Sequence, residues 1–147
     1  MKSAMILSAF LLAGVAIDAT AACTTGNRLE NTDLNALIPN SLVCGRPGTN
    51  YPGDASDRWQ EEHLVGGVLY DYKLGDGHPV DPRKQVGTWS ISGKKVIHTY
   101  GAYSYSWTVQ PISGNTYRFC KEDTNEEHVV AFIGPNTGSG CGGSFPP

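Results

Sequence analysis

The densest group of titratable side chains in the sequence is Glu61, Glu62 and His63, in a segment with the pattern of a β-strand. Successive strand side chains point to opposite faces, so Glu61 and His63 share one face and Glu62 lies on the other. A carboxylate beside an imidazole raises the pKa of that imidazole and suits acid–base chemistry. His98 alternates with apolar residues, so we expect it to face the interior of the sheet. A hydrolase or isomerase that uses Glu61, His63 and His98 is one hypothesis; the other is a hydrogen-bonded strand face without catalysis.

Motifs for metal binding and for nucleophilic catalysis are missing from the sequence. No two histidines or cysteines have the close spacing of metal ligands. Asp71, Asp76 and Asp81 are five residues apart, which differs from the alternate spacing of an EF-hand loop, and they favour a long loop between strands. There is no Gly-x-Ser-x-Gly motif, and the glycine-rich stretches precede no helix. We therefore expect neither a cofactor nor a metal, and the sequence gives no positive sign of an enzyme.

Aromatic residues are the most informative remaining feature. Many share the phase that would face inward in a sheet, which favours either a packed core or a cavity for a small ligand. The candidate ligand-binding residues are Trp59, His63, Tyr70, Trp89, His98, Tyr105 and Trp107. The expected ligand is a small apolar or aromatic molecule, or a protein partner.

All four cysteines, Cys23, Cys44, Cys120 and Cys141, follow a segment typical of secretion, and an even set in an oxidising compartment indicates disulfides. Four cysteines allow three pairings. Because Cys23 lies 21 residues before Cys44, and Cys120 lies 21 before Cys141, sequential pairing is attractive.

The N-terminus has the three parts of a secretory signal peptide: Lys2, an apolar run over residues 4–17, and small residues at 19–21. We expect residues 1–21 to be removed and residues 22–147 to form one domain, periplasmic or extracellular. Cys23 could instead be the lipidated first residue of a lipoprotein, although Thr20 departs from the usual branched aliphatic residue. No later segment is apolar for the length of a transmembrane helix.

The elements that must position these residues are short strands. Aromatic and hydroxyl side chains alternate over residues 103–109, which predicts a half-buried antiparallel strand. Other strands are expected at 58–65, 68–74, 86–91, 94–100, 115–121 and 127–133, and one short helix at 31–40. Turn residues leave only a few positions between most strands, so they should pair as hairpins. This order predicts a small antiparallel up-and-down β-barrel with one short N-terminal helix; a β-sandwich is the alternative.

A family resemblance rests on two features. Gly87-Thr88-Trp89 begins a predicted strand and resembles the Gly-x-Trp motif of small lipocalin-like bacterial barrels, although lipocalins carry it on their first strand. The stretches 57–63 and 71–82 are similar to uncharacterised secreted proteobacterial proteins. The resemblance implies a lipocalin-like barrel and no particular activity.

The net charge of −3 argues against a nucleic-acid-binding surface. The sequence favours a monomeric, exported binding module of unknown ligand. The alternatives are the small enzyme above and an inhibitor of an extracytoplasmic enzyme that acts through the loop at 75–84.

Overall fold

Eight antiparallel strands close into one barrel in the computed structural model, which describes residues 23–50, 57–72, 83–142 and 144–146. The strands are β1 (Ser41–Pro47), β2 (Trp59–Leu64), β3 (Val68–Tyr72), β4 (Lys84–Ser92), β5 (Lys95–Tyr100), β6 (Tyr103–Ser113), β7 (Thr116–Lys121) and β8 (Glu127–Pro135). Each pairs with its neighbour in sequence, and β8 returns to β1. The predicted up-and-down barrel is therefore confirmed.

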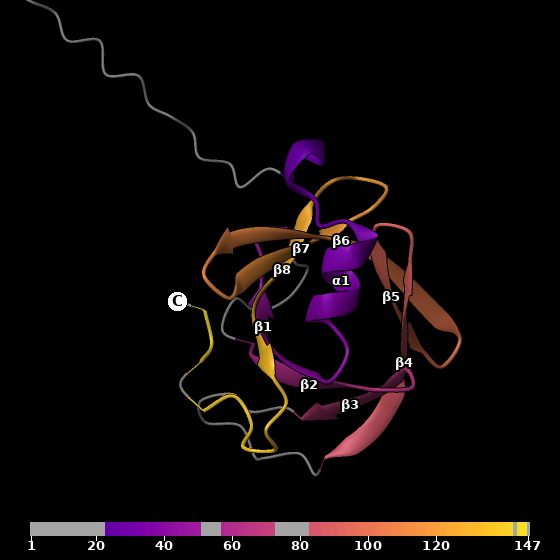
Figure 1. Ribbon diagram of the computed structural model, residues 1–147, viewed down its shortest axis with the longest axis vertical. Coiled ribbons are helices and arrows are strands. Elements are labelled where there is room, and N and C mark those ends of the chain that lie inside the picture. The colour runs from indigo at the N-terminus through magenta and orange to yellow at the C-terminus, as the bar shows by residue number, and fades with distance from the viewer. Residues whose placement is uncertain (1–22, 51–56, 73–82, 143, 147) are drawn as a thin grey trace, which may run out of the picture.

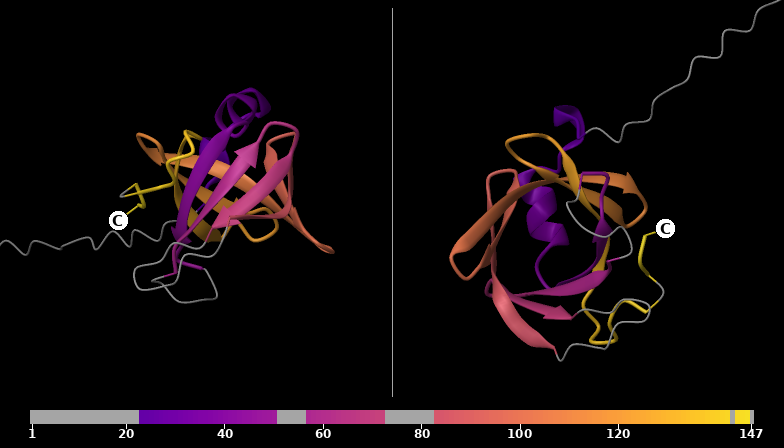
Figure 2. Two further views of the ribbon diagram at one scale, coloured as in Figure 1. Left: turned by 90° about the horizontal axis from the view of Figure 1, so that it is seen from below. Right: turned by 180° about the vertical axis from the view of Figure 1, so that it is seen from behind.

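The α-helix of the described residues, α1 (Asn31–Leu37), follows a short 3-10 turn, η1 (Thr25–Asn27). It lies within the ring of strands in the view of Figure 1, and the left view of Figure 2 places it at one end of the barrel. Leu34 and Ile38 are completely buried, and they pack with Val43, Val96 and other inward side chains. Because up-and-down connections alternate between the two ends of a barrel, the turns after β2, β4 and β6 share the end that α1 fills. The C-terminal ends of β1, β3, β5 and β7 lie at the opposite end of the barrel, here called the mouth.

Strand β1 is the element that the sequence pattern misses. Both of its faces are buried, so it lacks the alternation of apolar and polar residues that marks a half-exposed strand. Val43 faces the interior, whereas Leu42 and Cys44 pack outside against Cys141 and partly buried aromatic rings. The C-terminal segment thus covers the outer wall at β1.

The disulfides join Cys23 to Cys120 and Cys44 to Cys141, so the sequential pairing is wrong. Each bridge spans 97 residues and ties a terminal segment to the outside of the barrel wall. The Thr24 backbone and the Gln110 side chain also exchange hydrogen bonds beside the first bridge. The two bridges are consistent with an exported protein. No helix in the described ranges is both long enough and apolar enough to cross a membrane.

Candidate functional site

Strands β2 and β5 bring four polar side chains together inside the barrel. Glu61 and His63 alternate on β2, and His98 and Tyr100 alternate on β5, so all four point to the inner face. Strands β3 and β4 lie between β2 and β5 in the sheet, and the curvature of the barrel carries the two pairs toward each other. We call Glu61, His63, His98 and Tyr100 the interior polar cluster.

Hydrogen bonds link the members of this cluster. The Nε2 atoms of His63 and His98 are 2.9 Å apart, so one imidazole donates to the other. The Tyr100 hydroxyl donates to Glu61 Oε1 at 2.6 Å, and the Tyr100 hydroxyl oxygen also lies 3.5 Å from His98 Nδ1. The four side chains therefore form one connected network.

Aromatic rings enclose the histidines. Trp89 meets the edge of His63 with ring centroids 5.6 Å apart, and its indole N–H donates to the Leu64 carbonyl. Phe119 lies 6.3 Å from His98. His63 is 0% and His98 is 5% exposed, so bulk water does not screen the charges of this cluster.

Burial raises the pKa of Glu61 to about 7; the hydrogen bond from Tyr100 opposes this change, and the nearby Asp71 adds to it. Burial also raises the pKa of Tyr100, with the adjacent Glu61 charge as a further cause. A proton on the Glu61 carboxyl is therefore far easier to exchange near neutral pH than one on an exposed glutamate.

The histidines shift in the opposite sense, because burial disfavours their charged form. Burial, with the nearby His98 as a second cause, lowers the pKa of His63 well below its usual value. Burial lowers the pKa of His98 to about 4. Both imidazoles are neutral at pH 7, which is the form that accepts a proton or binds a metal.

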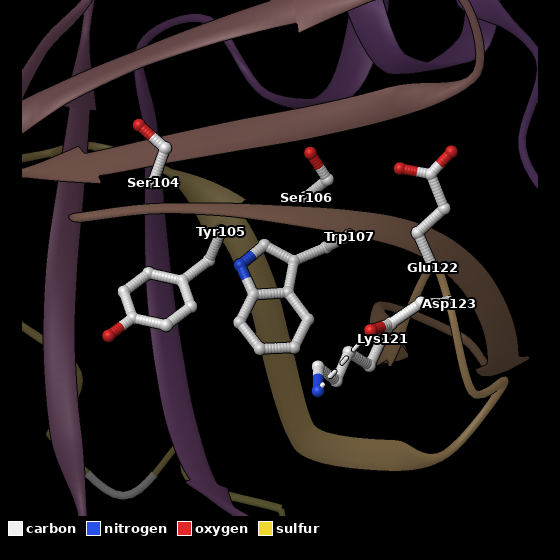
Figure 3. A pocket seen from close by; sticks show the side chains of 7 residues that line it. All are labelled: Ser104, Tyr105, Ser106, Trp107, Lys121, Glu122 and Asp123. Carbon is white, nitrogen blue, oxygen red and sulfur yellow. Dashed lines mark ion pairs between the residues drawn. The ribbon is translucent and has the colours of Figure 1, made fainter.

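A second feature lies at the mouth, where β6 extends beyond the end of β7. A pocket of about 530 Å³ is lined by Ser104, Tyr105, Ser106, Trp107, Lys121, Glu122 and Asp123. Figure 3 shows the Tyr105 and Trp107 rings side by side on one face of β6, and the two serines on the other. The two rings are stacked, with centroids 6.1 Å apart and planes inclined by 17°.

The ligand-binding residues predicted from the sequence fall in the interior polar cluster, in the mouth pocket and elsewhere on the barrel. His63 and His98 meet in the interior polar cluster with Trp89 against them, and Tyr105 and Trp107 form the mouth pocket. Trp59 is the inward neighbour of Gly45 on β1, and its ring occupies the space that a side chain at position 45 would need. Tyr70 lies on the outer wall, where the Arg83 guanidinium covers its ring at 3.9 Å.

Sequence reasoning missed the partners of these candidates. In the sequence, Tyr100 is one more aromatic residue two positions after His98, whereas in the structure its hydroxyl joins Glu61. Its alternation with His98 was the available signal. Lys121, Glu122 and Asp123 of the pocket end β7 and start the next turn, and nothing in their pattern separates them from an ordinary polar turn.

Asp71 of the suggested acidic loop lies on β3 and pairs with Glu61, facing the interior. Asp76 and Asp81, together with most of the 75–84 loop, fall outside the described residues.

Compared with known proteins, the chain matches no family model, no curated sequence and no solved structure. The geometry of the interior polar cluster and of the mouth pocket is therefore what indicates a function.

Proposed function

We propose that this protein is a binding module that works outside the cytoplasm and takes a small molecule with a flat apolar or aromatic face. The observation that carries the proposal is the stacked pair of Tyr105 and Trp107 in the mouth pocket. The signal peptide expected at residues 1–21 and the two disulfides support export.

Exposed aromatic rings at the mouth favour this function. Tyr105 is 45% exposed and Tyr103 is 71% exposed, although both have the phase of inward-facing residues. Large apolar rings left in contact with water are costly unless something covers them. A flat ligand face placed against Tyr105 and Trp107 would remove this surface from water and gain ring stacking.

The other pocket residues define the polar requirements of the ligand. Lys121 pairs with Asp123 at 3.5 Å, and Glu122 pairs with Lys95 at 2.8 Å, so both signs of charge surround the rings. Ser104 and Ser106 add hydroxyl groups. The pocket volume lies in the range of small-molecule sites, and its mixed lining fits a ligand with hydrogen-bonding groups at its edges.

Catalysis by Glu61, His63 and His98 is the second candidate, because the interior polar cluster brings these side chains into one hydrogen-bonded network. None of the three lines the mouth pocket, so a molecule bound there does not touch them. We therefore place binding before catalysis. An inhibitor that acts through the 75–84 loop is the third hypothesis.

Fluorescence titration with 8-anilinonaphthalene-1-sulfonate, a planar aromatic anion, tests the proposal. We expect saturable 1:1 binding that Trp107→Ala weakens at least about tenfold, as expected for the loss of one stacking partner. Trp59→Phe is the control, because Trp59 begins β2, packs against Gly45 and does not line the pocket, and it should change affinity less than about twofold. Absence of saturable binding, or an equal loss in both variants, would reject the mouth pocket as the binding site.

A further inference from the structure

We propose that Glu61, His63 and His98 form a binding site for a divalent transition metal ion of the zinc class. The donor atoms of these three buried side chains all lie within 4.8 Å of one another. This site lies inside the barrel and does not depend on ligand binding at the mouth.

The two imidazoles are arranged as a metal would need them. Their Nε2 atoms approach each other to 2.9 Å. Two nitrogens bound to tetrahedral zinc at about 2.05 Å lie about 3.3 Å apart, so a small outward movement of each ring would admit the ion. The Glu61 carboxylate, although it accepts a hydrogen bond from Tyr100, has further lone pairs for a third bond.

Tyr100 supplies the outer contacts that metal ligands usually have. Its hydroxyl lies 2.6 Å from Glu61 Oε1 and 3.5 Å from His98 Nδ1, which is the ring nitrogen turned away from His63. A ligating histidine commonly fixes its ring and tautomer through its second nitrogen, and a ligating carboxylate is commonly hydrogen-bonded. One tyrosine thus holds two of the three proposed ligands.

The charge balance of the interior also favours a cation. Glu61 is buried and Asp71 faces it across β2 and β3, while within the described ranges no lysine or arginine pairs with Glu61. Two imidazoles and a carboxylate prefer zinc and similar ions to calcium or magnesium, which prefer oxygen ligands alone.

Metal binding would change the proton positions of the histidines without any redox step. In the hydrogen-bonded pair one Nε2 carries a proton and the other accepts it. In the metal complex both Nε2 lone pairs bind the ion, so that proton moves to Nδ1 of the same ring and both histidines become Nδ1–H tautomers. Three protein ligands leave a fourth tetrahedral position for water or another donor.

The test is a titration of the untagged, disulfide-bonded protein with Zn²⁺ against a chromophoric chelator, after dialysis against EDTA. We expect one ion per chain. His98→Gln should weaken binding by more than about 100-fold and Tyr100→Phe by about tenfold, because changes in outer contacts cost about 10- to 100-fold. His128→Gln is the matched control: His128 lies beside Glu126 and the Trp107 ring and is not one of the three clustered donors, so its loss should leave affinity unchanged.

Nitrogen NMR of the ¹⁵N-histidine-labelled wild-type protein keeps the proposal testable if His98→Gln does not fold. Zn²⁺ should convert two histidines to Nδ1–H tautomers with Nε2 bound to metal. The proposal is overturned if no histidine signal responds to Zn²⁺, if binding is lost in His128→Gln, or if folded His98→Gln binds like the wild type.

Discussion

At the scale of single residues, Glu61 places an acidic group in an interior that opposes its charge. A carboxyl whose pKa is higher in the folded than in the unfolded state makes stability fall as pH rises between the two values, here from 4.5 to about 7. At pH values above both pKa values, the folded state carries the full free-energy cost of burying the charged carboxylate. Glu61→Gln removes the titration and leaves an amide oxygen that still accepts the hydrogen bond from Tyr100.

We therefore expect Glu61→Gln to raise the free energy of unfolding at pH 8 by on the order of 2 kcal/mol and to change it little at pH 4.5. Urea unfolding at both pH values, with EDTA present, measures this difference. Glu122→Gln is the control, since that carboxylate is exposed and its pair with Lys95 contributes little. An equal effect of Glu61→Gln at both pH values would show that the carboxyl charge is not the cause.

The inward faces of Glu61, His63 and His98 could be predicted from sequence, because side-chain alternation along a strand is a local property. The contact between His63 and His98 could not. It depends on how the barrel curves across β3 and β4, and no spacing in the chain encodes a distance between strands that are not neighbours. The same reason explains why the absence of a metal-ligand motif did not exclude the proposed metal site.

At the scale of elements, Gly87 explains part of the Gly-Thr-Trp motif. It lies at the irregular register between β3 and β4, where Leu69 pairs with it. A Cβ at Gly87 would lie 2.0 Å from the Thr99 carbonyl oxygen of β5. Since that atom belongs to the backbone, the two strands would have to separate to admit a methyl group.

Gly87→Ala should therefore lower the free energy of unfolding by more than about 2 kcal/mol, at the upper end of overpacking effects. Gly26→Ala in η1 is the matched control, because no atom lies within 4 Å of a Cβ there, and it should have almost no effect. Thermal unfolding of both variants in parallel measures the difference. Equal melting temperatures would mean that β4 and β5 are less tightly held than described.

Most strands could be predicted because one face of each meets the interior and the other meets water. Strand β1 could not, since the C-terminal segment buries its outer face and removes the polar half of the pattern. The helix was predicted over 31–40, but α1 ends at Leu37, before Asn40 with its left-handed φ of 58°. A tertiary contact therefore hid β1 from the sequence pattern, and a backbone turn outside the local pattern ended the helix earlier than predicted.

At the scale of the whole molecule, the disulfide pairing gives a direct prediction. Trypsin cleavage after Arg28, Arg58, Arg118 and Lys121 places each cysteine on a separate peptide. Mass spectrometry of the unreduced digest should find the Cys23 peptide joined to the Cys120 peptide, and the Cys44 peptide joined to the Cys141 peptide. A peptide joining Cys23 to Cys44 would contradict the structure. In the loop-entropy model, closing a loop of this length stabilises the folded protein by about 4 to 5 kcal/mol for each bridge.

The equal spacings in the sequence were compatible with both pairings. Cysteines at two equal separations of 21 residues necessarily also form two pairs at equal separations, here 97 residues. Two features of the fold distinguish the sequential pairing from the observed one. One is the closure of the barrel, which brings β8 beside β1, and the other is the course of the two terminal segments over the outer wall.

The two bridges also determine how the molecule would respond to mechanical force. If the chain were pulled at Cys23 and Cys141, tension would pass along residues 23–44 and the second bridge, and along the first bridge and residues 120–141. Each route contains only 21 residue steps, whereas the chain between Cys44 and Cys120 is much longer and would stay slack. The backbone of strands β2 to β6, which hold the interior polar cluster, would carry no covalent tension, and force would reach it only through hydrogen bonds to β1 and β7. In a crowded or flowing environment, the part of the barrel with the candidate chemistry is thus the part that stretching of the chain ends reaches last.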